Sequence, residues 1–166
     1  PLADSRPRTD QHRITPLETR FNTALTGAFG YELDLNLISK EEQSAVREQI
    51  ALYKEFRATV FGGAFHRLLS PFEGNETGWM YVAADGDEAL VFYFRDLVVG
   101  HTSWRRLRLR GLDPAARYRC GEDVFGGDLL MQSGLPVPKL EGDFQSSQGG
   151  SGFTPDRRVG KCEPPA

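Results

Sequence analysis

The sequence has few cysteines and no long apolar run, and both shortages limit what the chain can be. Cys120 and Cys162 are its only two cysteines, and neither has a close Cys or His at the spacing of a zinc site. No run of 18 or more apolar residues occurs, so the sequence predicts no membrane-spanning helix. We therefore expect no structural zinc, no disulfide framework and no membrane partner.

An excess of positive charge is also missing. The 20 Lys and Arg against 23 Asp and Glu give a formal net charge of -3, with a sequence pI near 5.7. Nucleic acids and anionic membranes attract basic surfaces, so we expect neither as a partner. Residues 1–13 are polar, without the apolar core of a signal peptide and without an initiator Met. Such a start fits a fragment or a processed chain, and it leaves the localisation unknown.

What the sequence does have is the composition of a folded protein. Its 166 residues are 39% hydrophobic and 11% aromatic, enough to bury one ordinary core. Thr15, Pro16 and Glu18 supply an N-cap hydroxyl, a proline at the first helical position and an acidic third residue. We predict that a helix begins there and ends at Gly27 or Gly30. Its apolar face would consist of Leu17, Phe21, Ala24, Leu25 and Ala28.

A second helix start follows the stretch Phe29 to Ser39. Ser39 with Glu42 three residues later predicts a capping box, in which each side chain accepts a hydrogen bond from the other's backbone N–H. The sequence predicts an amphipathic helix from Lys40 to about Val60, ended by Gly62 and Gly63. Its apolar stripe would consist of Ala45, Val46, Ile50, Tyr53, Phe56 and Val60.

After Gly63 the pattern changes from helical to alternating, which predicts a small antiparallel sheet or sandwich. The turn residues Asp85-Gly86 and Asp113-Pro114 separate the expected strands. The candidate strands are Ala64–Leu69, Gly78–Ala84, Glu88–Arg95, Trp104–Arg110, Ala116–Cys120 and Asp128–Met131. From about residue 148 the chain is rich in Gly, Ser and Pro, and we expect a flexible tail.

Acidic residues are the first candidates for chemistry. Paired carboxylates can act as the acid and the nucleophile in glycoside hydrolysis. Asp85, Asp87 and Glu88, however, fall in an expected hairpin turn, where Asp is favoured for its backbone hydrogen bonds. Glu32 and Asp34 alternate along an extended segment and suit exposed positions equally well. We favour the structural interpretation for all five.

Two other patterns allow a binding or a structural interpretation. Arg alternates with Leu between Trp104 and Arg110, which suits a phosphate-binding stripe or the solvated face of a half-buried strand. Trp79 and Tyr81 suit a platform for a sugar or one face of a core. We favour the solvated face for the arginines and the core for the aromatic pair.

The remaining candidates are isolated. His12, His66 and His101 have no Ser, Cys or acidic neighbour in a nucleophile motif. Asn75-Glu76-Thr77 matches a glycosylation acceptor, which matters only in a secreted eukaryotic protein. Residue chemistry alone therefore identifies no active site.

A resemblance to a known family rests on five blocks that occur in consistent order between about Gln11 and Ser146. The blocks are Thr15-Pro16-Leu17-Glu18-Thr19-Arg20, Gly30-Tyr31-Glu32-Leu33-Asp34-Leu35, Glu55-Phe56-Arg57, Phe65-His66-Arg67-Leu68-Leu69-Ser70-Pro71-Phe72 and Gly111-Leu112-Asp113-Pro114. Together they resemble the C-terminal portion of the family 36 glycoside hydrolases, the microbial α-galactosidases.

The resemblance implies an α+β chain, the final helices of a (β/α)8 barrel followed by a small antiparallel β-sandwich domain. Residues 1–63 would be the last helical elements of the catalytic barrel, 64–147 the β-domain, and 148–166 the flexible tail. The family usually continues with a further apolar strand after the segment that resembles Gly142 to Ser146. Here the sequence continues instead with Ser147-Gln148-Gly149-Gly150 and a tail that ends in proline.

The resemblance also implies hydrolysis of terminal α-galactosyl residues with retention, through an aspartate in a Lys-x-Asp motif and another in a Ser-Asp-Asn motif. Neither motif occurs in the 166 residues, so we expect no catalytic, cofactor-binding or metal-binding residue, no cofactor, and no activity of the chain alone. The α-galactoside substrate would bind the missing barrel, and the full-length enzyme would be a homo-oligomer.

The alternative is a non-catalytic β-module that binds carbohydrate or another protein. The two hypotheses differ in what should cover the apolar stripe Val46, Ile50, Tyr53 and Phe56. Complete coverage by residues 64–147 would favour the module, whereas in a barrel fragment the stripe should lack a full set of partners within this chain.

Overall fold

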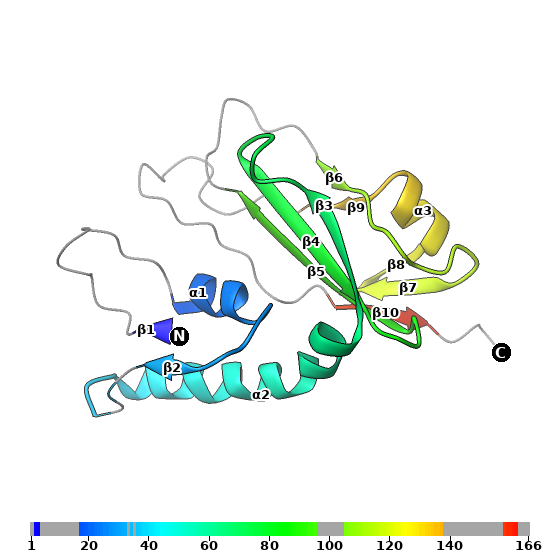
Figure 1. Ribbon diagram of the computed structural model, residues 1–166. Helices are drawn as coiled ribbons and strands as arrows, with labels where there is room; N and C mark the ends of the chain where they lie inside the picture. The colour runs from blue at the N-terminus through cyan, green and yellow to red at the C-terminus, as the bar shows by residue number, and fades with distance from the viewer. Residues whose placement is uncertain are drawn as a thin grey trace.

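The computed structural model describes residues 2–3, 17–32, 34, 36–95, 105–137 and 158–162 (Figure 1). Its helices are α1 (Leu17–Ala24), α2 (Lys40–Gly62) and α3 (Gly127–Gln132). Its strands are β1 (Leu2–Ala3), β2 (Tyr31–Glu32), β3 (Ala64–Leu69), β4 (Glu76–Val82), β5 (Glu88–Arg95), β6 (Arg106–Leu107), β7 (Arg117–Cys120), β8 (Asp123–Gly126), β9 (Leu135–Pro136) and β10 (Arg158–Cys162). The expected mixture of helices and antiparallel strands is confirmed.

The long helix α2 begins where the sequence predicts. The Glu42 backbone N–H donates to Ser39 Oγ at 3.1 Å, and the Ser39 N–H donates to Glu42 Oε2 at 2.9 Å, so the capping box is confirmed. The helix ends at Gly62 because Gly63 is extended, with φ -86° and ψ 171°. None of the helices in the described ranges is long and apolar enough to cross a membrane.

The capping box gives a first prediction. Ser39→Ala removes the acceptor for the Glu42 N–H, and it should lower the free energy of unfolding by about 1 kcal/mol. Urea denaturation followed by circular dichroism measures this loss. Ser44→Ala is the matched control, because Ser44 is exposed inside the same helix and alanine there is neutral or slightly stabilising. Equal losses for the two variants would show that the cap contributes nothing.

The N-terminal part of the chain forms a β-α-β-α unit. Strands β1 and β2 pair in parallel, with Leu2 opposite Tyr31 and Ala3 opposite Glu32, and α1 connects them. Parallel neighbours need such a crossover connection. Helix α1 begins at Leu17, next to its expected start, while Thr15 and Pro16 lie outside the described residues.

The rest of the chain is built on one six-stranded sheet. Its strand order is β3-β4-β5-β10-β7-β8, and every described pair in it is antiparallel. Strands β6 and β9 form a separate two-stranded ribbon, with Arg106 opposite Pro136 and Leu107 opposite Leu135. In Figure 1 the ribbon and α3 lie on one side of the sheet, and α1 and α2 lie on the other.

Both faces of the sheet are covered, so residues Ala89 to Arg95 of β5 are all buried. The cluster on the side of the ribbon contains Met80, Val82, Ala89, Val91, Tyr93, Leu107, Leu109, Leu112, Tyr118, Cys120, Leu130 and Leu135. The cluster on the helical side contains Phe21, Leu25, Phe56, Val60, Leu90, Phe92 and Phe94. Trp79 stacks on Phe92 and Phe94 in this second cluster, so the core interpretation of Trp79 is confirmed. The sheet therefore separates two buried clusters, one covered by the ribbon and α3 and the other by α1 and α2.

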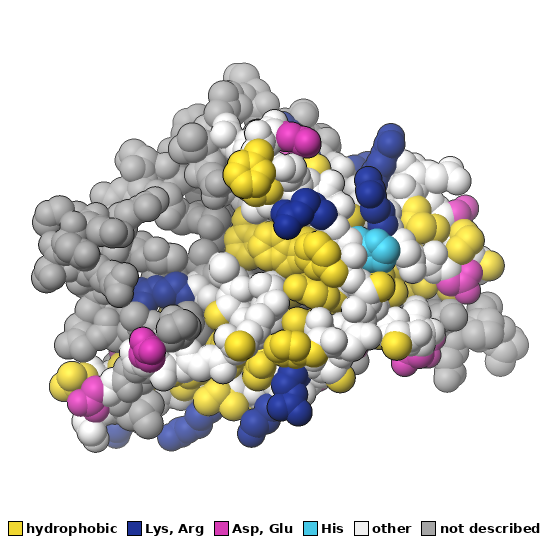
Figure 2. All heavy atoms as spheres, viewed as in Figure 1, with side chains coloured by type: hydrophobic (Ala, Val, Ile, Leu, Met, Phe, Trp, Pro, Cys, Tyr) yellow, Lys and Arg dark blue, Asp and Glu magenta, His cyan; other side chains and the backbone are white. Residues whose placement is uncertain are grey.

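Some apolar surface remains uncovered where α2 passes into β3. Phe61 is 61% exposed and Phe65 is 50% exposed, although the ring of Phe65 lies 5.4 Å from that of Tyr81. Figure 2 shows hydrophobic side chains gathered over the middle of the molecule on this face. Surfaces of this kind usually contact another protein segment.

Two of the expected strands are wrong or shorter than predicted. Residues 128–131 belong to helix α3, in which Leu130 is buried and Leu129 is 44% exposed. A segment as short as residues 128–131 fits the helical and the alternating period equally well, so the sequence pattern does not distinguish a helix from a strand there. Of the expected strand 104–110 the structure describes residues 105–110, and among these only Arg106–Leu107 is a strand, although Leu107 and Leu109 are buried.

The expected flexible tail is wrong at residues 158–162. These residues form β10, which lies inside the sheet between β5 and β7. The segment Arg-Val-Gly-Lys-Cys contains little apolar sequence. Its position depends on backbone pairing with two strands distant in sequence, which no local pattern reveals.

Candidate functional site

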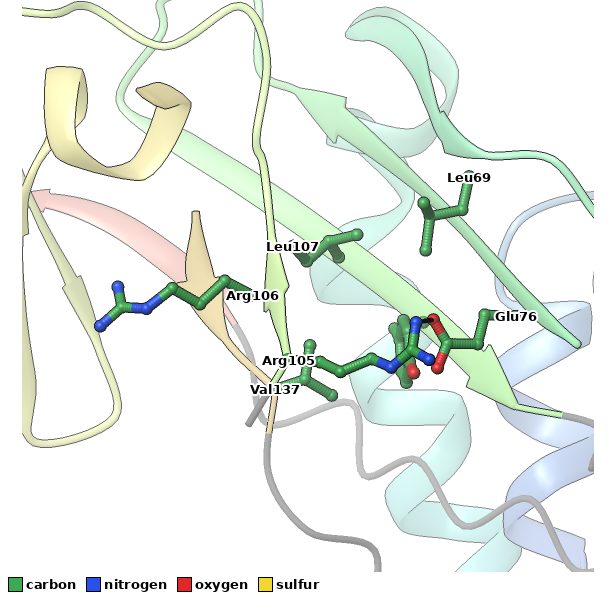
Figure 3. Close-up of a pocket in the computed structure, with 7 residues that line it drawn as sticks. Leu69, Glu76, Arg105, Arg106, Leu107 and Val137 are labelled. Atoms are coloured by element: carbon green, nitrogen blue, oxygen red, sulfur yellow. Dashed lines mark hydrogen bonds and ion pairs between the residues drawn. The ribbon is translucent and has the colours of Figure 1, made fainter. Parts of the chain in front are cut away.

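A pocket of about 280 Å³ opens where β4, β5 and the β6–β9 ribbon meet (Figure 3). Its apolar lining consists of Leu69, Leu107 and Val137, and its polar lining of Glu76, Tyr93, Arg105 and Arg106. Figure 3 shows Arg105, just before β6, reaching toward Glu76, while Arg106 extends away from it. The pocket therefore centres on the carboxylate of Glu76.

Glu76 is shared by two arginines from different parts of the fold. Arg95 Nε lies 3.2 Å from Glu76 Oε1, and Arg105 Nη1 lies 2.9 Å from Glu76 Oε2. Arg95 also donates from Nε and Nη2 to the Tyr93 hydroxyl, at 3.2 and 3.0 Å. The Arg95 side chain is 6% exposed and that of Arg105 is 55% exposed. One carboxylate thus compensates one buried and one exposed guanidinium group.

Burial is the main reason that the pKa of Tyr93 is raised, and its hydrogen bond to Glu76 raises the pKa further, against the lowering effect of Arg95. The Tyr93 hydroxyl is therefore protonated near neutral pH and contributes no charge. Arg106 Nη1 donates to the Gly134 carbonyl at 3.2 Å, away from Glu76. The ion pairs join β4 to β5 and to Arg105, the residue just before β6, and they present no paired carboxylates for glycoside cleavage.

The carboxylates at the β4–β5 turn do not form a catalytic pair. Asp85 Oδ1 accepts from the Asp87 N–H at 3.0 Å, next to Gly86 at φ 75°, which confirms the turn interpretation. Glu88 Oε1 instead accepts a 2.9 Å hydrogen bond from Thr59 Oγ1 of α2. Glu88 therefore links the sheet to the helical layer.

The other candidates lie at the surface or within packing contacts. Asp34 Oδ1 accepts from the Asn36 N–H at 2.9 Å, and both Asp34 and Glu32 are exposed. Arg106, Arg108 and Arg110 are exposed while the intervening leucines are buried, which confirms the solvated face. Asn75 is exposed just before β4.

The histidines offer no alternative centre in the described ranges. The ring of His66 lies against Gly111, where φ is 74° and an added Cβ would meet the ring. His12, His101 and Trp104 lie outside the described residues. The part of the chain that the structure describes contains no cluster of three or more His, Cys, Asp or Glu placed to hold a metal.

Sequence reasoning missed the ion pairs of the pocket. In the sequence, Glu76 stands only as the middle residue of a glycosylation acceptor, and Arg95 as the end of an expected strand. A detectable signal exists, because an arginine that ends the apolar run Leu-Val-Phe-Tyr-Phe needs a carboxylate when the strand is buried. The sequence does not say which carboxylate that is.

Two family models match the chain in consecutive order. The Melibiase model matches residues 3–63, and the model described as the glycosyl hydrolase family 36 C-terminal domain matches residues 76–148. The first covers the β-α-β-α unit and the second begins at the first residue of β4. These matches place the chain among the glycoside hydrolases.

The proteins and solved structures that the chain resembles include several alpha-galactosidases. Alpha-galactosidase AgaA of Geobacillus stearothermophilus is 47% identical over 135 residues, which are 81% of this chain and 18% of that protein. Alpha-galactosidase 1 of Pediococcus pentosaceus is 36% identical over 140 residues, covering 83% of this chain and 19% of that protein. The crystal structure of the GH36 alpha-galactosidase AgaB from Geobacillus stearothermophilus matches 97% of this chain and 21% of its own, with a TM-score of 0.83 and 40% identity.

The chain belongs to glycoside hydrolase family 36, of which it matches the C-terminal portion. It spans less than one quarter of the length of each of the relatives just described. A variant of AgaA from Geobacillus stearothermophilus has been crystallised in complex with raffinose. The match extends across both the helical part and the sheet, in the order that the sequence blocks predict.

Proposed function

We propose that this chain is the C-terminal part of a retaining α-galactosidase, which removes terminal α-galactosyl residues from oligosaccharides such as raffinose. The observation that carries the proposal is the consecutive match of the two family models, the first ending at residue 63, just after α2, and the second beginning at residue 76, the start of β4. In this proposal residues 1–63 supply the last elements of a (β/α)8 barrel, and 64–147 a β-domain of sandwich type that supports it.

The parallel pair β1–β2 supports the barrel assignment. Within the described residues the two strands pair only with each other, and a parallel sheet of two strands is not stable without further strands and helices. The repeat of strand and helix is the repeating unit of such barrels. The exposed Phe61 and Phe65 are also consistent with a larger neighbouring segment.

The apolar stripe of α2 supports the same assignment over the β-module. Val46 and Phe56 are buried, whereas Ile50 and Tyr53 are half-buried. The ring of Tyr53 stacks at 4.8 Å on Phe29, a residue outside 64–147. Residues 64–147 therefore do not cover the stripe completely, and complete coverage is the outcome that would favour the module.

Transplantation tests the proposal. We would replace the matched C-terminal portion of Geobacillus stearothermophilus AgaA with this chain and measure hydrolysis of p-nitrophenyl α-galactoside. We expect the chimera to be active, because the catalytic aspartates come from the AgaA portion, and we expect the isolated chain to release no galactose. AgaA truncated at the same junction is the control, and we expect it to be inactive. A folded but inactive chimera, or turnover by the isolated chain, would contradict the proposal. A homo-oligomeric state of the whole enzyme stays a prediction.

A further inference from the structure

We propose that the facing edges of β5 and β7 form a strand-binding slot, and that its occupant is the segment Arg158–Cys162. The backbone pairing of this segment on two sides holds it in the slot without the help of its covalent connection. The proposal concerns the sheet itself and does not depend on the α-galactosidase assignment.

The register of β10 is that of an inner strand. On one side Val159 lies opposite Ala89 and Gly160 opposite Glu88 of β5. On the other side the same two residues lie opposite Cys120 and Arg119 of β7. An antiparallel strand with neighbours on both sides directs its backbone N–H and C=O groups alternately to the two. The segment thus binds through its backbone, as in recognition by β-augmentation.

A contact beside β10 joins β7, which forms one wall of the slot, to the turn that precedes β5, the other wall. Ala89 of β5 and Tyr118 and Cys120 of β7 belong to the same buried cluster. The Tyr118 hydroxyl donates to the Gly86 carbonyl at 3.3 Å and accepts from the Asp113 N–H at 2.9 Å. Since Gly86 lies in the β4–β5 turn, Tyr118 joins β7 to the other half of the sheet. The slot is therefore organised by groups other than its occupant.

The slot also connects to the helical layer. Gly160 lies opposite Glu88, the residue that accepts the hydrogen bond from Thr59 of α2. When β10 occupies the slot, its pairing with β5 holds the backbone of Glu88 in place, and this in turn positions the Glu88 carboxylate for the hydrogen bond from Thr59. Loss of β10 should loosen the first residues of β5 and their attachment to α2, while the β3–β4 pairing is retained.

Cleavage of the chain after folding tests the proposal. A protease recognition sequence inserted between Gly149 and Gly150 allows the connection to be cut in the folded, full-length protein. After cutting, we expect the C-terminal fragment to co-elute with the rest in a one-to-one ratio by size-exclusion chromatography and mass spectrometry. The thermal midpoint should then depend on protein concentration, as it does for any bound ligand.

Two variants of the cleavable protein make the result specific. Gly160→Pro removes the N–H of a residue that is paired on both sides, so the fragment should dissociate at least about tenfold more readily. Glu163→Pro changes the residue just after the strand and should leave the retained fraction unchanged. Release of the unmodified fragment on cutting, unfolding of the whole protein on cutting, or equal retention of the Gly160→Pro fragment would each overturn the proposal.

Discussion

Gly63→Ala should lower the free energy of unfolding by about 3 kcal/mol, because a side chain at this position has no space. An added Cβ would lie less than 3.0 Å from the carbonyl oxygens of Thr59 and Val82, and both are backbone atoms that cannot rotate away. The Gly63 N–H also donates to the Thr59 carbonyl at 3.0 Å. The added methyl group would therefore separate the end of α2 from β4, where the two matched parts of the chain meet.

The adjacent Gly62 provides the control. It ends α2, and nothing lies within 4 Å of the Cβ that alanine would add. Gly62→Ala should therefore stabilise the protein, by up to about 1 kcal/mol from helix propensity. Urea denaturation of the two variants should therefore show changes of opposite sign in the free energy of unfolding, although the substitution is glycine to alanine in both. If Gly63→Ala unfolds at the wild-type urea concentration, the close packing of this junction is wrong.

Features that depend on neighbouring residues were predictable from the sequence. The Ser39–Glu42 capping box involves residues three apart, and the turn signals before β3 and β5 mark where these strands begin. The five sequence blocks identified the family because they span both the helical part of the chain and the sheet. In each case a few neighbouring residues, or the order of several short blocks of sequence, are enough to make the prediction.

Features that depend on distant partners were not predictable. Strand β10 has only two apolar side chains in its sequence, Val159 and Cys162, and is recognised only by its pairing with β5 and β7. The interaction of Glu76 with Arg105 joins residues 29 positions apart, and nothing in the local sequence distinguishes Glu76, whose side chain is 17% exposed, from a fully exposed carboxylate. The contact between Thr59 and Glu88 spans 29 positions as well. These are the contacts that join the ribbon and the helices to the sheet.

The pocket allows the largest electrostatic effect to be tested. Glu76→Ala should cost about 3 kcal/mol, because it removes the carboxylate that compensates the buried guanidinium of Arg95. Arg105→Ala removes the exposed partner of the same carboxylate and should cost less than about 1 kcal/mol. The two variants therefore distinguish the buried half of the network from its exposed half.

Urea denaturation of Glu76→Ala, Arg105→Ala and the double variant completes the measurement. Since the two side chains share one contact, the double variant should cost little more than Glu76→Ala alone. High salt should weaken the Arg105 contribution and leave that of Arg95 nearly unchanged, because the exposed pair is screened and the buried pair is not. Equal costs for the two single variants would mean that burial does not determine the strength of these ion pairs. The ion pair between Glu76 and Arg95 would then contribute no more to stability than an exposed surface salt bridge does.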